Sequence, residues 1–149
     1  MSRRRGRELA MQLLFQLDQS PVPPDEARQL FWRIRRTAPE AREFAERLVD
    51  GYLSRRDEVD EAIRRTVRRW RLERLAAVDR NILRAAVVEH WTVGTPKAVV
   101  IDEAVEIARK YGGEKSPEFV NGVLDHLLHD EEAEPAAESA QEERRKTKE

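Results

Sequence analysis

The stretch at residues 79–91, DRNILRAAVVEHW, decides the fold of this chain. Its apolar residues follow neither a period of two nor a single helical stripe, and on a helical wheel they fall on nearly every side. A helix that is apolar all round must be surrounded by protein or lipid, and about twelve residues are too few to cross a bilayer. We therefore predict a buried central helix near residues 79–91, with Asp79 as its N-cap.

The rest of the sequence offers helices to surround that stretch. Apolar residues recur at helical spacing near residues 5–19, 25–34, 37–52, 54–67, 95–111 and 116–128. Gly51 interrupts the third of these segments; because glycine inside a helix costs about 1 kcal/mol relative to alanine, we expect a close packing contact there. The sequence predicts an all-α fold, a compact bundle of about seven helices formed by residues 1–129. Residues 130–149 lack apolar periodicity and predict a disordered charged tail.

No set of residues typical of catalysis can be assembled. The chain has no cysteine, which excludes disulfides, thiolate metal sites and cysteine nucleophiles. It contains no glycine-rich phosphate loop and no nucleophile elbow. His126 and His129 stand three apart, but such a pair near a helix end is far more often a surface accident than a metal site. We predict that the protein is not an enzyme, holds no metal or cofactor, and, lacking a membrane segment, is cytoplasmic.

Positive charge is concentrated in the part of the chain expected to fold. The formal net charge is −1, yet residues 130–149 carry −4 and residues 1–129 carry +3. Residues 2–8, SRRRGRE, place Arg3, Arg4, Arg5 and Arg7 ahead of the first predicted helix. Such a basic arm is a common nucleic-acid contact, loose enough to order on binding. It can also be a solvated tail, and the arginine content can be a compositional bias.

A second basic stretch covers residues 64–74, with six arginines opposed only by Glu73. Arginines at the end of a helix complement its dipole, and most would simply be solvated. Their function stays open at this point.

Two further positions are candidates for binding. Met11 and Phe15 lie off the apolar stripe of the first helix, beside Glu8; they either meet another helix of this chain or form an apolar patch for a partner protein. Ser116 and Pro117 open the last predicted helix, next to Lys115, and Phe119 sits in its first turn. The free N–H groups of a helix start make this corner a ready anion site.

Several stretches together resemble the NusB family of transcription antitermination factors. The matching residues are RRRGRE at 3–8 with LLF at 13–15, LERL at 72–75 with VDRNILR at 78–84, IDEAVEIA at 101–108, and YG at 111–112 with FVNGVLD at 119–125. Their order and spacing agree over residues 3–128. The last two stretches in combination are the specific part of the resemblance.

The resemblance implies a compact helical fold whose role is binding. NusB proteins pair with NusE, a small-subunit ribosomal protein, and the heterodimer holds the single-stranded boxA element of nascent RNA. With other Nus factors this complex lets RNA polymerase read through terminators, notably in ribosomal RNA operons. By the family pattern, the residues facing RNA would be Arg3, Arg4, Arg5, Arg7, Lys115, Ser116 and Phe119. Those on the partner side would be Phe15 and Asp79, with Glu8 and Met11 beside them. Lys115 stands where some relatives carry an acidic residue.

Two other function classes stay open. A NusB-like domain also precedes the catalytic domain of some ribosomal RNA cytosine methyltransferases, so this chain could be a relic of such an enzyme or its partner in trans. It could also be a scaffold that binds only proteins, with residues 64–74 as a surface for an acidic partner. DNA binding through a helix-turn-helix is weaker, because the central helix is too apolar to lie in a groove.

Overall fold

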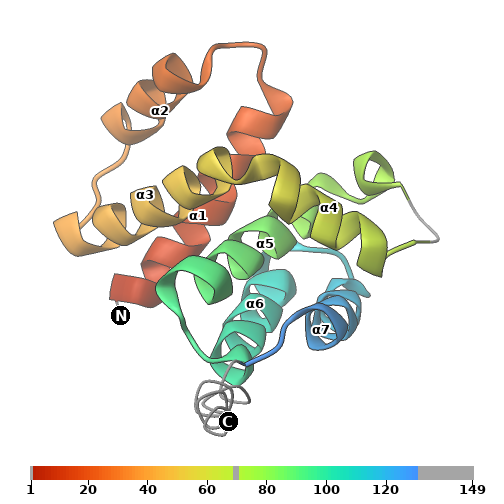
Figure 1. The fold of residues 1–149 in the computed structure, drawn as a ribbon. Coiled ribbons are helices and arrows are strands. Elements are labelled where there is room, and N and C mark those ends of the chain that lie inside the picture. The colour runs from red at the N-terminus through yellow and green to blue at the C-terminus, as the bar shows by residue number, and fades with distance from the viewer. Residues whose placement is uncertain (1, 69–70, 131–149) are drawn as a thin grey trace, which may run out of the picture.

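Helix α5 (Ala77–Val88) lies in the middle of the molecule, with the other helices arranged around it (Figure 1). The computed structural model describes residues 2–68 and 71–130. All nine side chains from Arg80 to Val88 are buried, as a helix that is apolar on every side requires. The predicted all-α bundle around a buried central helix is confirmed, and the described residues contain no strand.

The described residues form six further α-helices; five of them contact α5, and α2 packs on α1. Helices α1 and α3 lie side by side, and both pack against α5. Helices α6 and α7 form a second pair, and α4 contacts both α5 and α7 (Figure 1). A short 3-10 turn, η1 (Leu72–Arg74), leads into α5, and a π-helical turn, η2 (Glu89–Val93), continues it. The bounds of the other helices are α1 Ser2–Gln19, α2 Pro24–Arg33, α3 Pro39–Ser54, α4 Arg56–Thr66, α6 Lys97–Tyr111 and α7 Ser116–Leu127. None of these described helices is both long enough and apolar enough to span a bilayer.

Two glycines let helix α1 and helix α5 approach α3 closely. A Cβ atom built on Gly6 would lie 3.0 Å from the carbonyl oxygen of Ala41 and from Cβ of Phe44. On α3 itself, a Cβ at Gly51 would lie only 2.6 Å from Cγ1 of Val88 in the central helix. The close contact predicted at Gly51 is therefore confirmed, and α3 rests directly on the last turn of α5.

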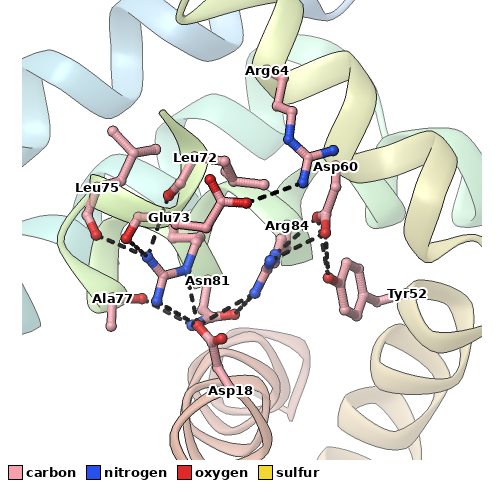
Figure 2. A network of polar contacts seen from close by, with 11 residues as sticks. Asp18, Tyr52, Asp60, Arg64, Leu72, Glu73, Leu75, Ala77, Asn81 and Arg84 are labelled. Carbon is pink, nitrogen blue, oxygen red and sulfur yellow. Dashed lines mark hydrogen bonds and ion pairs between the residues drawn. The ribbon is translucent and has the colours of Figure 1, made fainter. Parts of the chain in front are cut away.

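A network of buried polar groups ties α5 to three neighbouring helices (Figure 2). Arg84 donates from Nε to Oδ1 of Asp60 at 3.0 Å and from Nη2 to Oδ2 at 3.2 Å. The hydroxyl of Tyr52 donates to the same carboxylate at 3.0 and 3.1 Å. Burial raises the pKa of Tyr52 to about 12, so the hydroxyl keeps its proton at neutral pH. These contacts join α3 and α4 to the central helix.

Asp18, near the end of α1, completes the network from the other side (Figure 2). Its Oδ2 accepts hydrogen bonds from Nε of Arg80 at 2.9 Å and from Nδ2 of Asn81 at 3.0 Å, and Nη1 of Arg84 lies 3.4 Å away. Burial alone would raise the pKa of Asp18, but these hydrogen bonds and the charge of Arg84 outweigh it and lower the pKa below its usual value. The carboxylate is therefore ionised at neutral pH and neutralises arginines that α5 carries into the core.

Arg80 also fixes the point at which the central helix begins. Its Nη1 donates to the carbonyl oxygens of Leu72, Glu73 and Leu75 at 3.3, 3.3 and 2.9 Å. This bracket holds the η1 turn against the start of α5, and the helix begins at Ala77 with Ala76 as its N-cap. The prediction that Asp79 caps the helix is wrong. Because Arg80 holds the η1 turn in place, the helix begins two residues before Asp79, which therefore lies inside the first turn of α5.

The segment after α7 is held against the start of α6 as far as Asp130. Oδ1 of Asp130 accepts a hydrogen bond from the backbone N–H of Lys97 at 2.9 Å, and Nε2 of His90 lies 2.8 Å from the carbonyl oxygen of His129. Apart from Asp130, the predicted tail at residues 130–149 lies outside the described residues.

Replacing Gly51 with alanine should destabilise the fold. The new methyl group would meet Val88, which is buried and cannot move aside freely, and overpacking of this kind costs about 1–3 kcal/mol. Gly122→Ala is the matched control, since a Cβ there has nothing within 4 Å and removing a helical glycine should stabilise by about 0.5–1 kcal/mol. Urea denaturation measures whether Gly51→Ala lowers and Gly122→Ala raises the free energy of unfolding. Equal stability of the two variants would contradict the tight contact at Gly51.

Asp18→Asn should make the free energy of unfolding depend less on pH in the acidic range. Because the folded-state pKa of Asp18 is lowered, its contribution is present above the unfolded-state pKa and is lost as pH falls through the folded-state pKa. At pH 7 we expect a loss of about 1.5–3 kcal/mol, the range for hydrogen bonds to charged groups. At strongly acidic pH the variant and the wild type should converge. Denaturant titrations across pH measure this, with the exposed Asp25→Asn as control; parallel profiles for Asp18→Asn and the wild type would refute it.

Candidate nucleic-acid interface

The basic residues near the N-terminus lie inside helix α1, which begins at Ser2. Arg4 donates to Glu103 of α6 through Nε at 3.1 Å and Nη2 at 2.9 Å. Arg7 reaches Glu89 in the same forked manner, with both hydrogen bonds at 2.8 Å. The expectation of a loose arm ahead of the first helix is therefore corrected: these paired contacts to α6 and η2 hold the first turns of α1 in place.

Arg7 has a mostly buried side chain that pairs with a buried carboxylate. Its side chain is 12% exposed and that of Glu89 only 3%. The hydrogen-bonded carboxylate of Glu89 raises the pKa of Arg7 above its usual value. A carboxylate this deeply buried depends on its cation, because an unpaired charge in the core is strongly destabilising. The guanidinium of Arg7 is thus committed to Glu89.

The other three arginines of this end of α1 are exposed. The guanidinium carbon of Arg3 lies 4.6 Å above the ring of Phe44. Arg4 keeps 63% of its side chain exposed although it is paired, and Arg5 donates a single hydrogen bond, from Nη1 to Glu8 at 2.9 Å. Since a guanidinium carries five N–H donors, each of these side chains has donors left to offer a phosphate from a fixed position.

The corner between α6 and α7 carries the second set of predicted RNA contacts. Lys115 is exposed and forms the N-cap of α7. Ser116 is buried, and its Oγ accepts a hydrogen bond from the backbone N–H of Gly113 at 2.9 Å. Ser116 therefore shapes the turn. Phe119 is half-buried at the edge of the core and borders a groove whose other wall is Arg68 of the segment after α4.

Glu8 joins the basic end of α1 to the end of α6. It accepts hydrogen bonds from Nζ of Lys110 at 3.1 Å, from the hydroxyl of Tyr111 at 3.2 Å and from Arg5. Burial alone would raise the pKa of Glu8, but the hydrogen bonds from Lys110 and Arg5 overcome this and lower it. Through Glu8 the structure thus brings Arg5 beside Lys110 and Tyr111, which lead into the Lys115 corner.

The predicted partner-binding residues divide into buried and accessible ones. Met11 is 2% exposed and packs in the core, so for this residue the alternative of contact within the chain holds. Glu8 is buried in the ion-pair cluster just described. Phe15 and Asp79 are half-buried at the surface. Oδ1 of Asp79 is itself buried and has no hydrogen-bond partner within the described part of the chain.

Sequence reasoning missed the role of the carboxylates that organise this surface. Glu89, Glu103 and Glu8 each hold one or more cations of α1 or α6. Glu89 had a visible signal, because it is an acid directly after a run of buried apolar residues. Glu103 gave none, since its partner lies 99 positions away in the sequence.

Comparison with known proteins decides the family. The sequence profile of the NusB family matches residues 4–129. The chain belongs to the NusB family. Transcription antitermination protein NusB of Koribacter versatilis is 44% identical over 135 residues, which cover 89% of this chain and 92% of the relative. That of Anaeromyxobacter dehalogenans (strain 2CP-1) is 47% identical over 126 residues, covering 84% and 89%.

Solved NusB structures share the fold. NusB of T. maritima aligns with a TM-score of 0.72 at 37% identity, covering 84% of this chain and 89% of that one. A complex of the antitermination factors NusB and NusE with dsRNA aligns with a TM-score of 0.75 at 29% identity, covering 85% and 95%. The predicted NusB membership is confirmed, and these relatives carry the name of a transcription factor, in agreement with the prediction that the protein is not an enzyme.

Arg7→Ala should destabilise this NusB-family protein far more than Arg5→Ala does. Removing Arg7 leaves Glu89 buried without its cation, a change that typically costs about 3–5 kcal/mol, whereas Arg5 is exposed and should matter by about 0.5 kcal/mol or less. Thermal and urea unfolding measure both. Adding Glu89→Gln to Arg7→Ala should recover part of the loss, and no recovery would argue against a charge effect.

Proposed function

We propose that this protein is a transcription antitermination factor that binds boxA-type single-stranded RNA together with NusE. In this role it supports read-through by RNA polymerase and transcription of ribosomal RNA, in the cytoplasm. Its relatives over most of the chain are named transcription antitermination protein NusB, and one structural neighbour contains NusE and RNA. The observation that carries the proposal is the row of exposed guanidinium groups on the fixed end of α1, beside the turn into Lys115.

On the RNA side, Arg3, Arg4 and Arg5 contact phosphates, and Lys115 adds a fourth cation at the corner. Phosphate contacts dominate the affinity of such interfaces and make it depend on salt. Phe119 offers a ring on which a base can stack, a contact of about 1–3 kcal/mol. Ser116 holds the turn, and Arg7 holds Glu89, so both act by keeping these groups in position.

On the partner side, NusE contacts the face around Phe15 and Asp79. The partly exposed ring of Phe15 supplies apolar area, and the carboxylate of Asp79, whose Oδ1 is unpaired among the described residues, accepts a hydrogen bond from a basic side chain or a backbone N–H of NusE. Such a bond satisfies an atom that is otherwise buried without a partner. Other Nus factors and RNA polymerase join through this complex and need no surface of their own on this chain.

The pair of this chain with NusE should bind boxA RNA distinctly more tightly than the chain alone. Copurification followed by fluorescence titration measures both affinities. In the pair, Arg3→Ala/Arg5→Ala should reduce the log–log salt slope by about 1.4, since each neutralised phosphate of a single strand contributes about 0.7. The charge-matched control is Arg33→Ala/Arg36→Ala, two exposed arginines at the end of α2 and just beyond it.

Equal affinity of the pair and the isolated chain would refute the cooperative part of this proposal. An unchanged salt slope in Arg3→Ala/Arg5→Ala would remove the end of α1 from the RNA contact. Unfolding curves for both double variants serve as the control for folding, because all four arginines are exposed.

A further inference from the structure

A groove of about 300 Å³ runs between the end of α4 and the outer face of α7. We name it the α4–α7 groove; its lining is Thr66, Val67, Arg68, Phe119, Gly122, Val123 and His126. The α7 residues recur at helical spacing from Phe119 to His126, so the groove follows about two turns, or about 10 Å, of that helix. Phe119 stands at one end of this face and His126 at the other.

The floor of the α4–α7 groove is formed by apolar side chains and a glycine. Val67 and Val123 are buried beneath it. Gly122 is exposed and leaves the middle of the groove open, since a Cβ there would meet nothing within 4 Å. The ring of Phe119 borders the same space. An apolar floor beside an aromatic ring suits planar rings, such as nucleobases, which can stack on that ring.

The rim of the groove on the α4 side is cationic. Arg68 lines the groove, and Arg65 lies just outside that lining, on the last turn of α4; both side chains are exposed. Within residues 2–68 and 71–130 neither guanidinium has a carboxylate oxygen within 4.0 Å. Arg68 donates from Nε to the carbonyl oxygen of Arg65 at 3.1 Å, which orients its guanidinium and leaves the other donors free. Arg64, by contrast, is paired with Glu73 at 3.3 Å and lies 3.9 Å from Glu61.

We propose that the α4–α7 groove binds the single-stranded nucleotides that flank the boxA element of the same RNA. Bases lie on the floor next to Phe119, and their phosphates contact Arg65 and Arg68. This gives a role to the basic stretch that begins at residue 64. The inference rests on the proposed function, because the RNA must first be held at the end of α1 and at the Lys115 corner.

Continuity favours RNA over other occupants of the groove. Phe119 is four residues beyond the N-cap of α7 at Lys115, so a strand that leaves that corner along α7 enters the groove directly. The groove has an apolar floor beside a cationic rim, and a single strand has bases on one side and phosphates on the other, so the two surfaces are complementary. The acidic residues 130–143 of this chain are complementary in charge to the cationic rim, but they include no aromatic side chain that could stack on the floor.

The test uses the full chain in complex with NusE and two kinds of RNA. One is the boxA element alone, and the other is boxA extended by uridines at its 5′ or 3′ end. The ratio of the two Kd values defines the extension gain. For the wild type we expect a gain of about tenfold or more at one of the two ends, corresponding to one stacked base. Arg65→Ala/Arg68→Ala should abolish the gain and reduce the salt slope for extended RNA by about 1.4.

Gly122→Glu is a second variant: a Cβ at this position meets nothing within 4 Å, so the substitution adds a carboxylate at the groove and should also abolish the gain. Arg33→Ala/Arg36→Ala should retain it. If boxA alone binds but extension adds nothing, or if Arg65→Ala/Arg68→Ala keeps the gain, the inference is overturned while the proposed function stands. Tighter binding of extended RNA by Arg65→Ala/Arg68→Ala would also overturn it. Failure of boxA itself to bind would overturn both.

Discussion

The fold depends on pairing the arginines that the central helix carries into the core. Helix α5 is buried from Arg80 to Val88, and an arginine cannot be buried there unless carboxylates meet it. Asp18 and Asp60 do so from α1 and α4. These two acids therefore set where the end of α1 and the body of α4 lie relative to α5. A core made only of apolar contacts would constrain these positions less, because hydrophobic packing is not directional.

The same type of pair sets the surface that we propose contacts RNA. Glu89 extends the buried part of the central helix by one residue and draws Arg7 onto it, which fixes the rotation of α1 about its axis. With that rotation fixed, Arg4 lies against Glu103 of α6, Arg5 lies beside Glu8, and Arg3 lies over the Phe44 ring of α3. A cationic row that is already ordered loses less conformational entropy on binding than a loose arm would. The buried pair thus contributes to affinity through position, without touching the ligand.

The sequence predicts most of the architecture because burial leaves a periodic trace. The apolar run at 79–91 indicated the central helix, and Gly51 indicated the close approach of α3. The polar network left no such trace. Arg80 and Arg84 are four apart on a helix whose other sides are apolar, yet their partners Asp18 and Asp60 lie far away in the chain. Nothing in the local pattern distinguishes these acids from solvated ones. Nothing in it shows that Arg80 holds the η1 turn either, so the pattern points to Asp79 as N-cap although α5 begins at Ala77.

Part of the candidate site was predictable in identity but not in arrangement. The arginines at the start of α1 and Phe119 stand out in the sequence, but the placement of Phe119 beside Arg68 requires the contact between α4 and α7. The net charge of −1 is no guide to this surface either. At physiological salt, exposed charges interact over only about 8 Å. A bound strand therefore responds to the few arginines within that range, and a protein with an acidic balance can present a cationic track.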